Sequence, residues 1–350
     1  MSLGAPWVTH PWVAEGAQRI RFGVDGGGAR GDWLALLDWA QTVEDLGFDS
    51  FWINDHTGTS WRDCWTALTA VAIKTRRVRL GSLVSCVYYR PPSLLARMAA
   101  DVDRLSNGRL VLGLGVGDLP SEFAQLGLPF PSLPMRQAAL GETVEILRGL
   151  WSGDPFTFDG AHFRVGAAAV RPGPVQAPRV PILIAGGGER VTMRQVAQYA
   201  DASNFGPSGA MGSAWESGDV AQKYAVLRQH CEQIGRPYDS VLRTFYPNLL
   251  LAKTESEVQA KVDARAARSP LMERPRLPGM PREFRATYVL STPDQIPLHI
   301  VAGTPEQVTE YLRLLVEAGV QYVSVSGNDA ETVQLLSEQV MPQFQGAAFA

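Results

Sequence analysis

Hydrophobic and polar positions follow two alternating patterns along almost the whole chain. Short runs of β-branched and aliphatic residues predict buried strands, and the stretches between them have apolar residues at helical spacing. In the first such pair, a strand over Arg19–Val24 precedes a helix that begins near Asp32 and places Leu36, Ala40 and Val43 on one face. Strands that alternate with helices in this way predict an α/β protein with a parallel sheet.

The same pattern recurs to the end of the chain. Further strands are expected at residues 50–54, 78–84, 110–115, 182–185, 202–205, 242–251 and 321–326. Further helices are expected at residues 61–75, 92–106, 136–151, 189–200, 219–234, 254–268, 305–318 and 329–340. Eight strands, each followed by a helix, predict a TIM (β/α) barrel that forms a single domain with insertions.

An open, doubly wound sheet is the alternative architecture. Its dinucleotide fingerprint would match Gly26, Gly28 and Gly31, but the expected helix starts only after the last of these glycines. The second strand ends in Asp55 followed at once by His56, rather than in a lone acidic residue. These two departures favour the barrel.

The barrel is expected to span residues 19–345, after an N-terminal extension at residues 1–18. Two segments interrupt it. Residues 155–178 have the pattern of a β-hairpin insert, and the Pro- and Arg-rich residues 269–297 are expected to form a long loop.

Composition narrows the class of partner. Among 350 residues, Lys and Arg number 32 and Asp and Glu 35, so the net charge of −3 gives no broad cationic surface. We therefore expect a small-molecule substrate, and neither a nucleic-acid nor a membrane partner. The three cysteines are far apart and the histidines lack ligand spacing, which argues against a disulfide scaffold or a metal centre. Without a signal-peptide pattern or a long apolar run, a cytoplasmic location is expected.

In a barrel, functional groups lie where strands run into the following loops. These positions hold Asp25, Asn54–His56, Ser82–Cys86, Gly115–Asp118, Gly186–Gly188 and Gly206–Ser208. The recurring glycines either let the backbone approach a flat or phosphorylated ligand closely or simply serve tight turns.

Two of these strand ends carry chemistry of their own. Gly186–Gly188 opens a helix directly after a strand, and its free amides, with Arg190 and Thr192, suit a phosphate monoester or diester. His56, beside Asp55, is a candidate for proton transfer, although a lone histidine is more often structural. No nucleophile motif of a hydrolase is present. The aromatic residues Trp52, Trp61, Trp65, Tyr88 and Tyr89 either wall an apolar substrate pocket or belong to the core.

With these residues in view, the chain resembles the bacterial luciferase-like family of flavin- and deazaflavin-dependent oxidoreductases. The resemblance runs in order from about residue 20 to 342, through residues 49–56, 78–84, 92–97, 105–117, 142–151, 181–190, 200–201, 303–306 and 340–342. It implies a TIM barrel that holds a ribityl-phosphate cofactor at the carboxyl ends of its strands.

The resemblance also assigns roles. It implies that Asp55 and His56 lie at the redox centre, as in the deazaflavin subgroup. A non-proline cis peptide at Leu83-Val84 would support the back of the ring, and Gly115 and Gly117 would lie along it.

The phosphate role falls to the loop after the fifth barrel strand, at Ala185, Gly186, Gly187, Gly188 and Thr192. Asp118 stands where sugar-phosphate dehydrogenases of this group carry a catalytic acid, so it joins His56 as a catalytic candidate. The family's residue there is glutamate, and here Glu122 follows one turn later. The shorter side chain departs from the sugar-phosphate pattern.

The function implied is that of a coenzyme F420-dependent oxidoreductase, which transfers a hydride to or from a small organic substrate. The alternative is an FMN-dependent monooxygenase on the same barrel, and a third reading is a non-catalytic flavin-binding barrel. The pattern is compatible with a homodimer.

Overall fold

The computed structural model describes residues 7–16, 19–26, 31–56, 60–206, 217–267, 271–273, 287–291, 297–327 and 329–345. Within them, nine strands form the main sheet in the order β3-β2-β1-β15-β10-β9-β8-β5-β4, and an additional pairing of β3 with β5 closes it into a ring. Its strands are β1 (Arg21–Asp25), β2 (Ser50–Ile53), β3 (Arg79–Ser82), β4 (Ser85–Cys86), β5 (Leu110–Gly115), β8 (Ile182–Ala185), β9 (Ala202–Phe205), β10 (Leu242–Phe245) and β15 (Tyr322–Val325). The predicted α/β TIM barrel is confirmed.

The helices of the described residues follow the predicted order. They are α1 (Pro11–Gly16), α2 (Trp33–Asp45), α3 (Cys64–Lys74), α4 (Pro92–Leu105), α5 (Pro120–Gln125), α6 (Leu133–Trp151), α7 (Thr192–Tyr199), α8 (Ser217–Gln233), α9 (Glu255–Ala266), α10 (Pro305–Glu317) and α11 (Ala330–Leu335). Short 3-10 or π turns are η2 (Tyr238–Ser240), η3 (Leu336–Val340) and η4 (Met341–Phe344). None of these helices is long and apolar enough to cross a membrane.

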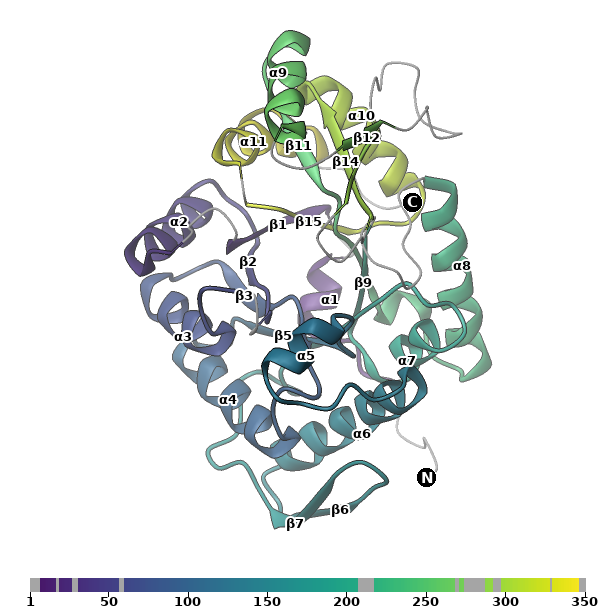
Figure 1. Ribbon diagram of the computed structural model, residues 1–350. Helices are drawn as coiled ribbons and strands as arrows, with labels where there is room; N and C mark the ends of the chain where they lie inside the picture. Colours follow the sequence, from purple (N-terminus) through teal and green to yellow (C-terminus); the bar gives the residue numbers. More distant parts are fainter. Residues whose placement is uncertain are drawn as a thin grey trace. The chain divides into compact units, whose positions relative to one another are not determined.

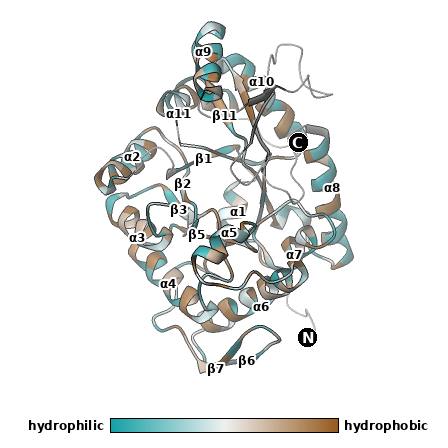
Figure 2. Ribbon diagram, in the orientation of Figure 1, coloured by the Kyte–Doolittle hydropathy of each residue, from teal (hydrophilic) through white to brown (hydrophobic). Residues whose placement is uncertain are grey.

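The chain divides into two compact units. One comprises residues 22–185 and 325–337, and we call it the redox unit because it contains His56, which the family resemblance assigns to a redox centre. In it, α3 packs on α2 and α4, and α4 packs on α6; Figure 1 shows these helices following one another along the outside of the strands. Hydrophilic and hydrophobic colours both run along α4 in Figure 2, and its buried side includes Leu95, Ala96 and Ala99.

The other unit comprises residues 1–21, 186–324 and 338–350, and we call it the loop unit because it contains Gly186–Gly188. Here α8 packs on α7 and α10. A second sheet, ordered β11-β14-β13-β12, contains β11 (Leu249–Leu251), β12 (Leu271–Glu273), β13 (Thr287–Ser291) and β14 (Pro297–Gly303). Leu250, Val262, Ile300 and Ala302 form a buried apolar cluster between this sheet and α9.

The insert at residues 155–178 contains the predicted hairpin. β6 (Phe156–Asp159) and β7 (Arg164–Ala168) pair antiparallel, with Asp159 opposite Arg164. Glu142 on α6 accepts hydrogen bonds from the backbone N–H groups of residues 161–163, so one helix carboxylate fixes the hairpin turn.

Two predictions about the loop unit are wrong. The strand expected at residues 242–251 is two strands, β10 and β11, and β11 pairs with β14 in the second sheet. Pro247 lies between them, and proline has no N–H to continue a ladder. Residues 269–297, expected as a loop, supply β12 and β13 to that sheet wherever the structure describes them.

Other expectations fall outside the described residues in part. Gly27, Gly28 and residues 207–208 at predicted strand ends lie outside them. The N-terminal residues 1–18, expected as an extension, contain the short helix α1, in which Trp12 is buried.

Candidate active site

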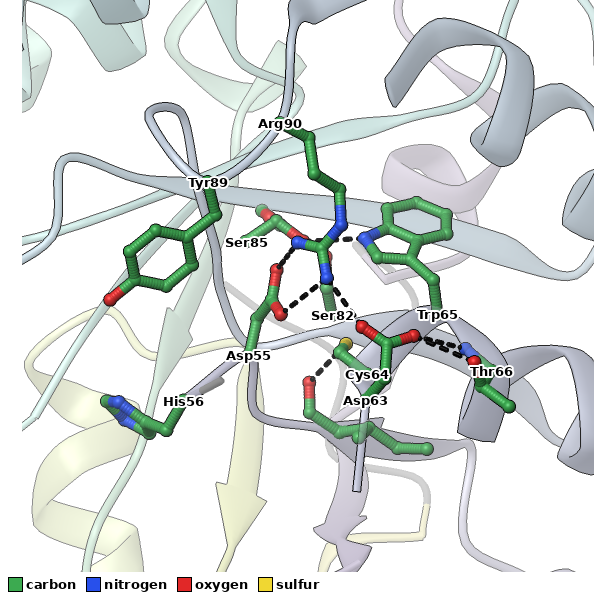
Figure 3. A network of polar contacts seen from close by, with 12 residues as sticks. Asp55, His56, Asp63, Cys64, Trp65, Thr66, Ser82, Ser85, Tyr89 and Arg90 are labelled. Atoms are coloured by element: carbon green, nitrogen blue, oxygen red, sulfur yellow. Dashed lines mark hydrogen bonds and ion pairs between the residues drawn. The ribbon is translucent and has the colours of Figure 1, made fainter. Parts of the chain in front are cut away.

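The end of β2 presents two neighbouring side chains in different directions. Asp55 is buried, and both of its carboxylate oxygens accept hydrogen bonds from Arg90, at 2.5 and 3.1 Å. Arg90 also donates to Asp63 at 2.7 Å, and Asp63 is the N-cap of α3. Figure 3 shows the Arg90 guanidinium between the two carboxylates, with the His56 ring directed away from it. Asp55 is therefore paired with Arg90 rather than with His56.

His56 is held instead by a carboxylate from α5. Its Nδ1 lies 3.2 Å from Oε2 of Glu122, and the Tyr89 hydroxyl donates to the same oxygen at 2.6 Å. The Glu122 side chain is 1% exposed, whereas that of His56 is 45% exposed. The site thus joins a buried anion to a half-exposed imidazole.

This arrangement favours the charged imidazole. The hydrogen bond to Glu122 raises the pKa of His56 above its ordinary value of 6.5, and the charges of Glu122, Asp118 and Asp55 act in the same direction. Burial opposes them, but does not reverse the shift. The raised pKa favours the protonated imidazole, and a histidine held in this way is a candidate for exchanging a proton during turnover.

The backbone bends between β3 and β4. The peptide bond Leu83-Val84 is cis, as the family resemblance implied, and both side chains remain partly exposed. β4 pairs in parallel with β5, with Cys86 opposite Gly115. A Cβ on Gly115 would lie 2.6 Å from the Val84 Cγ2 atom, so only glycine leaves Val84 its place over β5. Leu83 and Val84 therefore present a partly exposed apolar surface at the strand ends.

The loop after β5 carries the second catalytic candidate. Asp118 is exposed, and its charge contributes to the raised pKa of His56. Arg136 from α6 is buried, donates to the carbonyl oxygens of Val116 and Gly117, and stacks its guanidinium over the Phe130 ring. The arginine fixes the backbone from which Asp118 extends. The catalytic role of Asp118 stays a prediction.

Aromatic side chains gather near Glu122 within the redox unit. Phe123 contacts the rings of Tyr88, Tyr89 and Phe130, and Tyr88 also contacts Phe163. Trp52 and Trp65, two of the residues considered for a substrate pocket, are 0% and 2% exposed and belong to the core. Tyr88, Tyr89 and Trp61 are partly exposed and remain candidates for the substrate side.

The loop unit holds the predicted phosphate loop. Gly186 has a φ of +127°, and a Cβ on Gly188 would lie 3.0 Å from the Thr192 hydroxyl oxygen. Lys223 of α8 is buried beside the loop and donates to the carbonyl oxygen of Gly187 at 2.8 Å. The two glycines leave room for the Thr192 side chain against the loop, and the Lys223 ammonium group, which also lies 3.6 Å from Glu189 Oε1, is at the same turn. Ala185 is the last residue of β8.

Three residues that hold His56 and Asp55 were not predicted for that role from the sequence: Glu122 was noted only as an acid one turn after Asp118, Tyr89 only as a possible wall of a substrate pocket, and Arg90 not at all. Sequence spacing does not show that two adjacent residues after β4 contact the end of β2 and α5, Arg90 binding Asp55 and Tyr89 binding Glu122. The signal that the sequence offered for Arg90 was a charged residue, between Tyr89 and Pro91, shortly after the end of another strand. Within the described residues, no group of three metal-ligating side chains is present.

The closed parallel barrel and the strand-end site define an oxidoreductase of luciferase-like type. The chain belongs to the luciferase-like monooxygenase family, whose model matches residues 17–322.

Named relatives agree with this class. The chain is 27% identical over 323 residues to an F420-dependent glucose-6-phosphate dehydrogenase of Amycolatopsis mediterranei, covering 89% of this chain and 94% of the relative. It is 33% identical over 238 residues to the enzyme of the same name from Kineococcus radiotolerans, covering 66% and 67%. The coenzyme F420-dependent tetrahydromethanopterin reductase of Methanopyrus kandleri has the same fold, with a TM-score of 0.73 at 21% identity over 93% of this chain and 99% of that chain.

Proposed function

We propose that this protein is a coenzyme F420-dependent oxidoreductase that transfers a hydride between the deazaflavin and a small organic substrate. The observation that carries the proposal is His56, which follows β2 and is hydrogen-bonded by the buried Glu122. A half-exposed histidine with a raised pKa suits a reaction in which a proton moves with the hydride. The F420-dependent enzymes among the relatives support the choice of cofactor.

The residues of the redox unit fit the ring of such a cofactor. A flat, largely apolar ring needs an apolar surface that the backbone does not obstruct. Leu83 and Val84 provide the surface, and Gly115 keeps Val84 in place because it lacks a Cβ.

The residues of the loop unit fit the phosphate of such a cofactor. Gly186–Gly188 precedes α7, whose first residue is Thr192, and helix N-termini favour anions. Lys223 lies beside Gly187 and shares its positive charge with Glu189. In the proposal, the backbone amides of the loop and the Thr192 hydroxyl donate to the phosphate.

When bound, a deazaflavin supplies a hydride at its carbon 5, and the protein supplies orientation and electrostatics. His56 exchanges a proton at Nε2, because its Nδ1 is engaged by Glu122. The negative charge of Asp118 assists by favouring the protonated form of His56. Glucose 6-phosphate appears in the names of two relatives. Asp118 departs from the glutamate that the family resemblance implies for a sugar-phosphate substrate, so the proposal leaves the substrate as a small organic molecule.

Equilibrium titration of the purified protein with coenzyme F420 and with FMN, followed by visible fluorescence, tests the proposal. Tighter binding of F420 is expected. FMN that binds at least about tenfold more tightly would contradict the proposal and favour the monooxygenase reading, since a tenfold preference is about 1.4 kcal/mol. F420 that binds but exchanges no hydride with any of a panel of alcohols, aldehydes, imines and enones would favour the non-catalytic barrel.

A further inference from the structure

Two adjacent residues that follow β4, Tyr89 and Arg90, hold two adjacent residues that follow β2, Asp55 and His56. Arg90 binds the Asp55 carboxylate through two hydrogen bonds, and Tyr89 reaches His56 through Glu122. Figure 3 shows Tyr89 and Arg90 on one segment, with Arg90 extending toward Asp55. One short segment therefore binds the Asp55 carboxylate directly and the His56 ring through Glu122.

The two contacts to Glu122 meet on one atom. Tyr89 Oη and His56 Nδ1 both lie within hydrogen-bond distance of Oε2, at 2.6 and 3.2 Å. Burial and the bond to Glu122 raise the pKa of Tyr89 above its ordinary value of 10.0, so its hydroxyl stays protonated and donates. Because a carboxylate accepts this bond, the second bond to Oε2 comes from His56 Nδ1–H.

This bonding pattern leaves one ring nitrogen for chemistry. Within the described part of the chain, His56 Nε2 makes no hydrogen bond, and the side chain is 45% exposed. A histidine whose Nδ1–H is held by a carboxylate has a defined tautomer and ring orientation. The exposed Nε2 is the nitrogen that can exchange a proton with a bound molecule.

We propose that Glu122 and Tyr89 are positioning residues: Glu122 holds His56 at Nδ1 so that Nε2 exchanges the proton, and Tyr89 sets the strength of that hold by sharing the Glu122 oxygen. The catalytic role of His56 rests on the proposed function, but its bonding to Glu122 does not. The relation between the three side chains can therefore be measured in the protein without cofactor.

The two positioning residues have opposite electrostatic effects on His56. Replacing Glu122 by Gln removes the negative charge and the acceptor that favour the imidazolium, so the pKa of His56 should fall. Replacing Tyr89 by Phe removes a donor that partly neutralises Oε2, so the carboxylate attracts His56 more strongly and the pKa of His56 should rise. The other groups that act on His56 are the Asp118 and Asp55 carboxylates, which both variants retain.

Tyr88→Phe is a matched control. Tyr88 is also partly exposed, and its ring also packs against Phe123, but within the described residues its hydroxyl makes no hydrogen bond. A purely packing role for Tyr89, whose ring also contacts Phe123, would make the two phenylalanine variants behave alike.

The experiment is an NMR pH titration of ¹⁵N-histidine-labelled protein, with the His56 signals assigned by their loss in His56→Asn. We expect wild-type Nδ1 to be the protonated nitrogen of the neutral ring, the His56 pKa to fall in Glu122→Gln, and the pKa to rise in Tyr89→Phe but not in Tyr88→Phe. Thermal unfolding checks that each variant is folded.

The proposal is overturned if Tyr89→Phe and Tyr88→Phe titrate alike, or if Nε2 carries the proton in the neutral wild-type ring. In the proposed reaction, Tyr89→Phe should lower kcat by about tenfold with little change in KM. If F420 does not bind, the titration results still decide the positioning roles, so failure of the proposed function is distinguishable from failure of this inference.

Discussion

At the scale of single residues, His56 is the centre of the proposed chemistry. General acid–base catalysis is worth roughly a hundred- to ten-thousand-fold, so His56→Ala should lower kcat by a factor in that range. The barrel should stay folded, because the side chain is 45% exposed and contributes little to the core. Steady-state kinetics with a verified substrate, together with thermal unfolding, measures both effects.

Asp118→Asn is the companion variant. A larger loss of kcat than in His56→Ala would make the Asp118 carboxylate the proton-exchanging group and reduce His56 to positioning the ring.

Since the pKa of His56 is raised, the ionisation seen in the pH dependence of kcat should lie above 6.5. As pH rises through the pKa of His56, kcat for substrate reduction should fall because the imidazolium loses the proton it would donate. Over the same range, kcat for substrate oxidation should rise because the neutral imidazole can accept a proton.

Arg90 is expected to matter for stability as well. Its carboxylate partner Asp55 has a fully buried side chain, so Arg90→Met leaves an uncompensated charge and should cost about 3–5 kcal/mol of unfolding free energy. The exposed pair of Arg164 and Asp159 provides the control, because Arg164→Met should cost at most about 1 kcal/mol. Urea unfolding at neutral pH measures both, and equal losses would show that the Asp55 charge is compensated elsewhere.

At the scale of elements, the hydroxyl at the start of α7 should bind the cofactor phosphate. Thr192→Val keeps the shape of the side chain but removes the donor, and should weaken F420 binding by about 1.5–3 kcal/mol, as for a hydrogen bond to a charged group. Thr192→Ser retains the hydroxyl and should bind nearly as well as the wild type. Unchanged affinity of the valine variant, measured by fluorescence titration, would show that the phosphate binds elsewhere.

Most elements were predictable from the sequence because each carries its own signal. Thr304, Pro305 and Gln307 specify the start of α10, and the structure has that capping box. The second sheet of the loop unit was not predicted because a pairing between distant short strands leaves no local pattern. The one local signal was Pro247, which separates β10 from β11 and marks the end of the first strand.

The candidate site was predictable only at its strand ends. His56 and Leu83-Val84 follow strands, so position along the chain suffices to find them. Glu122 and Arg90 act on residues more than thirty positions away, at 3.2 Å and 2.5 Å, and such contacts depend on how loops fold back over strand ends. A single sequence has no pattern that predicts how a loop folds back over the strand ends.

At the scale of the whole molecule, buried helix carboxylates that accept backbone N–H groups recur in the redox unit. Glu44 of α2 accepts from residues 76–78, and Asp103 of α4 accepts from residues 175 and 176. Glu142 of α6, which is partly exposed, does the same for the hairpin turn. Each carboxylate ties a helix to the segment that leads into or away from a strand.

Acid should therefore unfold the protein partly through Glu44. Burial raises the pKa of this carboxyl, but the hydrogen bonds from Val78, Arg77 and Arg76 outweigh it, and the pKa in the folded protein lies below the ordinary value of 4.5. A lowered pKa gives stability that is fully present above about pH 4.5 and is lost as pH falls through the folded value.

Glu44→Gln tests this prediction because the amide cannot ionise. The variant should be less stable than the wild type at pH 7 by about 1–3 kcal/mol, since one acceptor replaces an ionised carboxylate bound by three backbone donors. The difference between the two proteins should shrink as pH falls below about 4.5, where the wild type loses the ionised Glu44. Glu145→Gln, on an exposed position of α6, is the control and should leave both stability and its pH dependence unchanged. Urea unfolding between pH 7 and pH 3 measures the three proteins, and a constant difference across that range would show that ionised Glu44 has no part in acid unfolding.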